Sequence, residues 1–140
     1  GLKHVLFVGA VGEDDKAALL TLCYAMAFPS HLRSEAFGIS LLEGAMYGKP
    51  MISSEIGTGT TYINIDGDTG LVVPPSDPQA LGEAMRKLWD NPQMAADMGK
   101  RAEARYWELF SSETMANNYL ALYEELAARR AVTQLAPAGA

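Results

Sequence analysis

Short apolar runs alternate with amphipathic stretches along the first half of this chain. Four apolar runs have the length and composition of buried strands, namely residues 4–9, 25–30, 51–54 and 71–73. Helical spacing predicts one helix from Asp14 or Asp15, as its cap, to about Tyr24, and another from about Gly38 to Tyr47. Strands that alternate with helices pair in parallel, so the pattern predicts a doubly wound α/β sheet.

The second half of the chain is predicted to be helical. Asp77 followed by Pro78 is a helix cap with proline at the first helical position, which predicts a helix to about Asp90. Two more helices are predicted, over about 92–110 and from 111 or 112 to about 130. Residues 133–140 have no periodicity, so we expect one domain over residues 1–131 and a frayed tail over residues 132–140.

Two glycine-rich segments connect the predicted strands. Residues 54–61 are expected to form a loop and residues 66–70 a tight turn. Gly57-x-Gly59 lacks the third glycine of a dinucleotide-binding fingerprint, because Tyr62 stands in its place. Asp66 and Asp68 look like a metal-binding carboxylate pair. They precede a strand instead of following one, away from the edge where such sheets bind ligands, so we expect a turn and no metal.

The segment from residue 28 to residue 50 carries the strongest chemical pattern. Glu35 and Glu43 lie eight residues apart, one before the predicted helix and one inside it. The free amides and the dipole at the start of this helix favour a phosphate, and Gly38 permits close approach of a ligand to the backbone. Side chains on a helix tilt toward its N-terminus, so Glu43 leans toward the end that Glu35 faces. A sugar linked to a nucleoside diphosphate fits this layout. His31 and Arg33, in the preceding loop, are candidates to line the cleft.

Composition excludes several other classes of partner. The chain of 140 residues is 49% hydrophobic and carries a formal net charge of -6. Non-specific nucleic-acid binding depends on Lys and Arg neutralising phosphates, so nucleic acid is not an expected partner. Cys23 is the only cysteine, which excludes an intrachain disulfide. No apolar run approaches the roughly 20 residues that cross a bilayer, and no signal-peptide pattern is present. We expect a cytoplasmic protein whose membrane contact, if the intact enzyme has any, is peripheral.

Taken together, the motifs resemble glycosyltransferase family 4. Glu35-x7-Glu43, with Phe37-Gly38 inside it and Gly48-Lys49-Pro50 behind, is similar to the E-x7-E motif of that family. The Phe28-Pro29-Ser30 run, the Gly57-Thr58-Gly59 loop and the stretch from Asp66 to Pro75 follow in the family's order and spacing. The resemblance covers nearly the whole chain. It implies a Rossmann-like parallel sheet, the C-terminal donor-binding domain of a GT-B enzyme, truncated on its N-terminal side and closed by C-terminal helices.

The resemblance also implies roles for individual residues. Glu35 becomes the catalytic residue that contacts the donor sugar, and Glu43 accepts hydrogen bonds from the ribose hydroxyls. The remaining donor-binding residues it implies are Phe37, Gly38, Ile39, Ser40, Gly57, Thr58 and Gly59. The donor is a nucleotide-diphosphate sugar, no metal or other cofactor is required, and transfer retains the anomeric configuration. An N-terminal domain absent from this sequence brings the acceptor.

Two departures from the family pattern refine the expectation. The family's Arg and Lys that neutralise the departing diphosphate lie on earlier strand–helix units that are absent here, and Lys3 is no credible substitute. We therefore expect the fragment alone to be inactive and to self-associate through unpaired strand edges, or to rearrange its sheet. Many members also carry a glutamate near Thr61. The variant found here resembles bacterial O-polysaccharide mannosyl- and rhamnosyltransferases, which favours a GDP-linked donor.

Two other interpretations remain open at this stage. One is another GT-B-type enzyme, such as a nucleotide-sugar epimerase. The other is a non-catalytic α/β interaction module. A receiver domain is disfavoured because it needs an aspartate at a strand end, and none of the four predicted strands ends in one.

Overall fold

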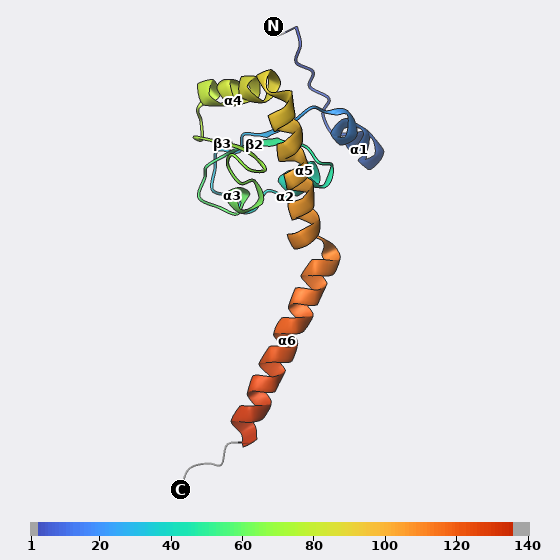
Figure 1. Cartoon of the computed structure of the whole chain (residues 1–140), viewed down its shortest axis with the longest axis vertical. Coiled ribbons are helices and arrows are strands. Elements are labelled where there is room, and N and C mark those ends of the chain that lie inside the picture. Colours follow the sequence, from blue (N-terminus) through green and yellow to red (C-terminus); the bar gives the residue numbers. More distant parts are fainter. Residues whose placement is uncertain (1–2, 136–140) are drawn as a thin grey trace.

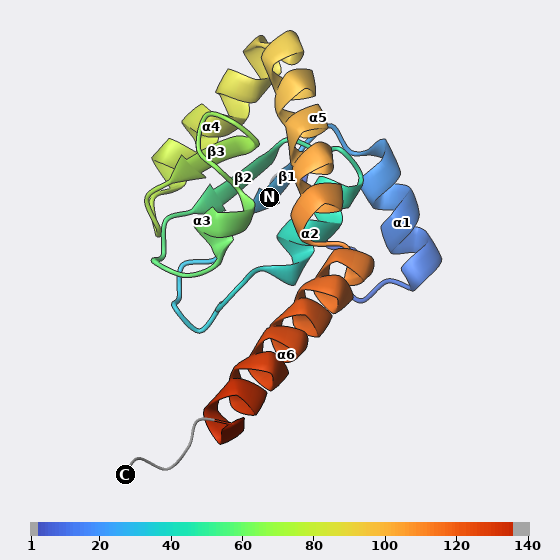
Figure 2. The same cartoon turned by 60° about the horizontal axis from the view of Figure 1, so that its bottom comes forward.

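A three-stranded parallel sheet forms the centre of the protein. The structure is a computed structural model that describes residues 3–135, with the side chains of residues 3–130. The strands are β1 (Met26–Phe28), β2 (Met51–Ser54) and β3 (Gly70–Val73), in the order β1-β2-β3. Met51 is in register with Met26 on one side and Gly70 on the other. The predicted parallel α/β sheet is confirmed, and the loops that follow the strands share one edge of it (Figures 1 and 2).

Helices pack on both faces of the sheet because neighbouring residues of β2 point in opposite directions. All four residues of β2 are buried, as expected for the central strand of a parallel sheet. Ile52 packs toward helix α4 (Pro78–Asp90), and Met51 packs toward helix α2 (Ile39–Met46). Helix α5 (Pro92–Leu109) contributes to both clusters. The first comprises Ile52, Leu71, Val73, Ala84, Leu88, Ala95 and Met98, and the second Leu41, Ala45, Met51, Ile63 and Ala102.

Local signals set the limits of the helices that follow the sheet. The Asp77 carboxylate accepts a hydrogen bond of 2.9 Å from the backbone N–H of Ala80, and Pro78 occupies the first turn of α4. Pro92 likewise starts α5. Both helices match the predicted ranges to within a residue, because an N-cap and a proline act locally.

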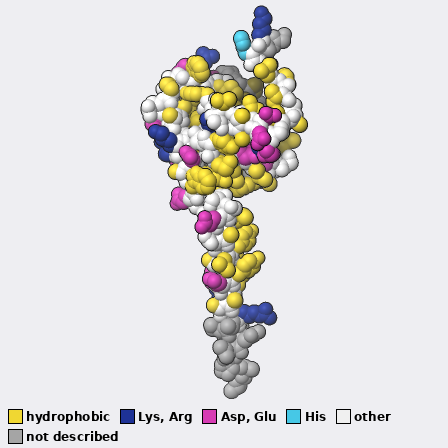
Figure 3. Space-filling view, turned by 90° about the vertical axis from the view of Figure 1, so that its right-hand side faces the viewer, with side chains coloured by type: hydrophobic (Ala, Val, Ile, Leu, Met, Phe, Trp, Pro, Cys, Tyr) yellow, Lys and Arg dark blue, Asp and Glu magenta, His cyan; other side chains and the backbone are white. Residues whose placement is uncertain are grey.

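Helix α6 (Ser112–Leu135) extends away from the α/β body (Figures 1 and 2). Its apolar side chains are about half exposed, and they gather along one side of the helix (Figure 3). They are Met115, Tyr119, Leu120, Leu122, Tyr123 and Leu126. The helix therefore presents an exposed apolar surface. The helix continues to Leu135, past the predicted end. Residues 136–140 of the predicted tail lie outside the described residues.

The first predicted strand is wrong. Residues 5–8 form no strand, and Leu6 and Phe7 are 87% and 97% exposed. An apolar run becomes a strand only when another strand bonds to it, and in the described chain β1 pairs with β2 alone. Helix α1 (Glu13–Leu22) follows this segment. It begins after Gly12 without a side-chain cap, so the predicted cap at Asp14 or Asp15 is also wrong.

The glycine-rich segment after β2 is a loop that ends in a short helix. Helix α3 (Thr60–Ile63) was not predicted, because four residues are too few to show a helical period. The predicted tight turn over residues 66–70 is present and leads directly into β3.

Candidate functional site

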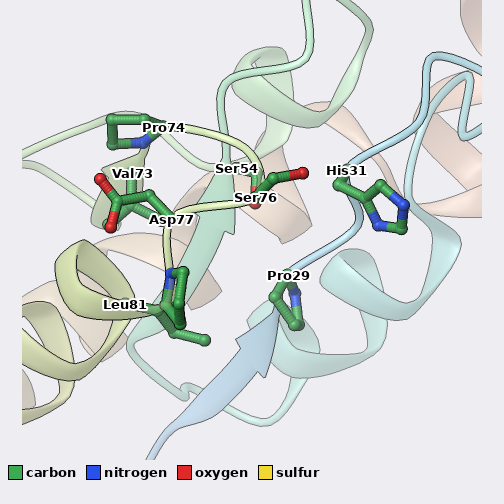
Figure 4. A pocket seen from close by; sticks show the side chains of 9 residues that line it. Pro29, His31, Ser54, Val73, Pro74, Ser76, Asp77 and Leu81 are labelled. Atoms are coloured by element: carbon green, nitrogen blue, oxygen red, sulfur yellow. The ribbon is translucent and has the colours of Figure 1, made fainter.

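The loops that follow the three strands surround a hollow of about 240 Å³ at the carboxyl edge of the sheet. Pro29 and His31 line it after β1, Ser54 at the end of β2, and Ser76 and Asp77 after β3 (Figure 4). The Ser76 side chain points toward His31, whereas Asp77 points away from it (Figure 4). His31, a candidate to line the cleft, does line this hollow, whereas Arg33 and the predicted catalytic and donor-binding residues do not. The hollow adjoins them through the loop that runs from β1 to α2.

Glu35 folds back onto the start of α2. Its Oε1 accepts a hydrogen bond of 3.0 Å from the backbone N–H of Gly38, the residue that caps the helix. Gly38 has φ +95°, a conformation that favours glycine, and a Cβ there would lie only 3.0 Å from Leu41 Cδ1. The half-buried Glu35 carboxylate is therefore held at the positive end of a helix, next to the amides of Ile39 and Ser40.

The Gly57–Gly59 loop packs against the loop that carries Glu35. The backbone N–H of Gly59 donates to the Ala36 carbonyl at 2.9 Å, and a Cβ at Gly59 would lie 2.6 Å from the Phe37 ring. Arg33 Nη1 lies 3.3 Å from where a Cβ at Gly57 would stand. Glycine is thus required for this close approach. The structure brings the two predicted donor-binding segments together.

Glu43 lies on the side of α2 that faces α1. Lys16 Nζ of α1 bonds to Glu43 Oε1 at 2.9 Å and to Glu13 Oε2 at 2.8 Å. Hydrogen bonds to Glu13 and Glu43 raise the pKa of Lys16, so the ammonium stays charged throughout the neutral range. A glutamate among the apolar residues of α2 needs a polar partner. That the partner is Lys16, 27 positions earlier, had no signal in the sequence.

A buried polar network supports the end of α3. Asn64 is fully buried, and its amide nitrogen donates to Ser53 Oγ at 2.9 Å and to the Leu71 carbonyl at 3.1 Å. Its amide oxygen accepts from Thr69 Oγ1 at 3.2 Å. These bonds join β2, β3 and the residue that ends the helix following the Gly57–Gly59 loop. Asn64 belongs to no motif that predicts this role, although a polar residue among buried strands must find such partners.

Asp66 and Asp68 have structural partners. Asp66 Oδ1 accepts a 2.9 Å hydrogen bond from the backbone N–H of Val72, and Asp68 pairs with Arg101 at 2.7 Å. Both lie in the turn that precedes β3, at the opposite end of that strand from the ligand edge. Within residues 3–135, no helix combines the length and apolarity needed to span a membrane.

Comparison with known proteins gives one consistent family. The family model described as "Glycosyl transferases group 1" matches residues 1–105. A D-rhamnosyltransferase of Pseudomonas aeruginosa is 71% identical over 112 residues, which cover 80% of this chain and 29% of that protein. The O-antigen chain mannosyltransferase C of Escherichia coli is 49% identical over 126 residues, 90% of this chain and 34% of that protein. The chain thus spans about a third of the length of these relatives.

Solved structures agree on the fold. Sucrose-phosphate synthase from Thermosynechococcus elongatus superposes with a TM-score of 0.78 at 31% identity, covering 89% of this chain and 30% of that one. Anabaena HepE in complex with UDP-glucose gives a TM-score of 0.70 at 21% identity, covering 76% of this chain and 29% of that one.

Proposed function

Because this chain belongs to the group 1 glycosyl transferases, we propose that it binds the nucleotide-sugar donor of a retaining hexosyltransferase. The observation that carries the proposal is the meeting of two loops at the carboxyl edge of the sheet. There Glu35 and the start of α2 lie against the Gly57–Gly59 loop, joined by the bond between Gly59 and Ala36. Ligands of parallel α/β sheets bind at this edge.

Each part of the site has a chemical role in this proposal. The amides of Phe37 to Ser40 receive the sugar and the diphosphate at the helix start, where partial positive charge favours anions. Glu35 contacts the donor sugar and stabilises positive charge as the sugar leaves the diphosphate. Glu43 accepts hydrogen bonds from the ribose hydroxyls. Lys16 holds one oxygen of Glu43, while Oε2 makes no hydrogen bond among the described residues.

We propose a GDP-linked hexose as the donor. Relatives at 71% and 49% identity are named as a D-rhamnosyltransferase and a mannosyltransferase, and the resemblance to such enzymes favours guanine. A structural neighbour binds UDP-glucose, which makes UDP-linked sugars the main competitor. A thermal-shift screen of GDP-, UDP- and ADP-linked donors tests the choice. The largest rise in melting temperature should come from a GDP-hexose, and a larger rise with a UDP-sugar would overturn it.

We propose that an N-terminal domain outside this sequence binds the acceptor, a glycan or a lipid-linked sugar, and brings it to the donor. We therefore expect the chain alone to bind donor weakly and to transfer nothing. In the longer enzyme, radiolabelled hexose should pass from donor to acceptor with retention of configuration. Net epimerisation of the donor without an acceptor would instead identify an epimerase. Absence of any nucleotide binding would favour an interaction module.

Self-association is the remaining part of the proposal. In the described chain β1 bonds to β2 alone, and the apolar residues 5–8 are exposed nearby in the sequence. Unpaired strand edges recruit other chains, so we expect dimers or larger species in sedimentation. A monomer at all concentrations would remove this expectation without affecting the donor site.

A further inference from the structure

Three aromatic rings and a guanidinium meet where α5 ends and α6 begins. Phe110, the residue that directly follows α5, lies edge-on to Phe37 at 6.2 Å and to Tyr62 at 5.7 Å between ring centres. The Arg105 guanidinium of α5 lies 5.1 Å from the Tyr62 ring centre and 5.7 Å from that of Phe110. We call these four residues the junction cluster.

Arg105 is committed to this cluster. Its Nη2 donates a 2.7 Å hydrogen bond to the Tyr62 carbonyl, within the last turn of α3. Its Nε is buried and has no hydrogen-bond partner among the residues that the structure describes. Burying a hydrogen-bond donor without an acceptor is unfavourable. The attraction between the guanidinium and the rings of Tyr62 and Phe110 offsets part of this cost. Arg105 thus ties α3 to α5 at some cost to its own hydrogen bonding.

The junction cluster reaches both loops of the proposed donor site. Phe37 lies between Glu35 and Gly38, and its ring is in contact range of Gly59 on one side and Phe110 on the other. Tyr62 belongs to the helix that continues the Gly57–Gly59 loop. The loop ahead of α2 and the loop ahead of α3 therefore both rest on Phe110, a residue outside the E-x7-E segment by more than sixty positions.

We propose that Phe110 and Arg105 are positioning residues for donor binding. They hold Phe37 and Tyr62 so that the amides at the start of α2 and the Gly57–Gly59 loop keep their relative geometry. This inference rests on the proposed function, and it adds residues of the α5–α6 junction to a site otherwise built at the sheet edge. Small displacements of positioned groups weaken binding and catalysis strongly.

The test compares Phe110→Ala with Phe110→Tyr, which retains the ring, and with Leu88→Ala. Leu88 is buried in the other core cluster and lies outside the junction cluster, so it controls for a general loss of stability. Two quantities are measured at a temperature where every variant is folded. One is the affinity for GDP-mannose and UDP-glucose by calorimetry, and the other is amide exchange at Gly38 and Gly59.

Phe110→Ala should weaken donor binding and accelerate exchange at Gly38 and Gly59 by about tenfold, because two ring contacts are lost together. Phe110→Tyr should restore both, and Leu88→Ala should change neither. If Phe110→Ala does not fold, Arg105→Met should give the same pattern with a smaller amplitude. Unchanged affinity and unchanged exchange in a folded variant would overturn the inference. If the wild-type chain binds no donor, the proposed function fails, while the exchange rates still decide whether the cluster holds the loops.

Discussion

Asn64→Ala should be among the most destabilising single substitutions in this protein. The Asn64 side chain is fully buried and makes three hydrogen bonds, to Ser53, Leu71 and Thr69. Each is worth about 1 kcal/mol, and the buried partners left behind add a further penalty. We expect a loss of about 3–5 kcal/mol, a large part of the 5–15 kcal/mol that is typical of a folded domain.

Urea unfolding, monitored by far-ultraviolet circular dichroism, measures this loss in the free energy of unfolding. With a slope of about 2 kcal/mol per molar urea, the midpoint should fall by about 2 M. Asn117→Ala provides the matched control, because Asn117 is exposed on α6 and its loss should change stability by less than about 0.5 kcal/mol. A loss of less than about 1 kcal/mol for Asn64→Ala would refute the view that this network supports the end of α3.

Three further predictions concern how the elements are held together. Lys16→Met should speed amide exchange in α1 and leave β2 protected, because α1 contributes no buried residue and is attached to α2 through Glu43. An exchange rate in α1 equal to that of the wild type would contradict this. Gly99→Ala should lower the melting temperature sharply, since a Cβ there would overlap the Gly48 carbonyl oxygen, whereas Gly82→Ala, with open space around it, should not. Removing residues 112–140 should shift the melting temperature by only a few degrees, because none of the described side chains of α6, residues 112–130, belongs to either core cluster; unfolding of the shortened chain would show that α6 is part of the core.

The sequence predicts the fold best where the deciding interactions are local. The cap at Asp77, the prolines at 78 and 92 and the apolar run of β2 each act within a few residues, and those elements lie where expected. The run at residues 4–9 has the same composition as a strand. Whether this run forms a strand depends on a partner strand that bonds to it. The residues of the run do not show whether such a partner is present.

In the candidate site, too, contacts between sequence neighbours could be predicted and contacts between distant residues could not. Glu35, Gly38 and the start of α2 are neighbours in the sequence, and the structure places them together as predicted. The contacts of Lys16 with Glu43 and of Arg105 with Tyr62 join residues 27 and 43 positions apart. Such pairs depend on how helices pack, which hydrophobic periodicity does not specify.

Calorimetry on Glu43→Ala and Glu35→Gln, each with GDP and with GDP-mannose, tests the central claim most directly. Charge-assisted bonds from ribose to Glu43 are worth roughly 1.5–3 kcal/mol each, so Glu43→Ala should weaken both ligands by about tenfold or more. Lys16→Met loses the same ion pair but keeps the carboxylate, so it should weaken them less. Glu35→Gln should leave GDP affinity unchanged and remove any additional affinity for GDP-mannose. If both glutamate variants bind both ligands as tightly as the wild type, the donor does not bind here.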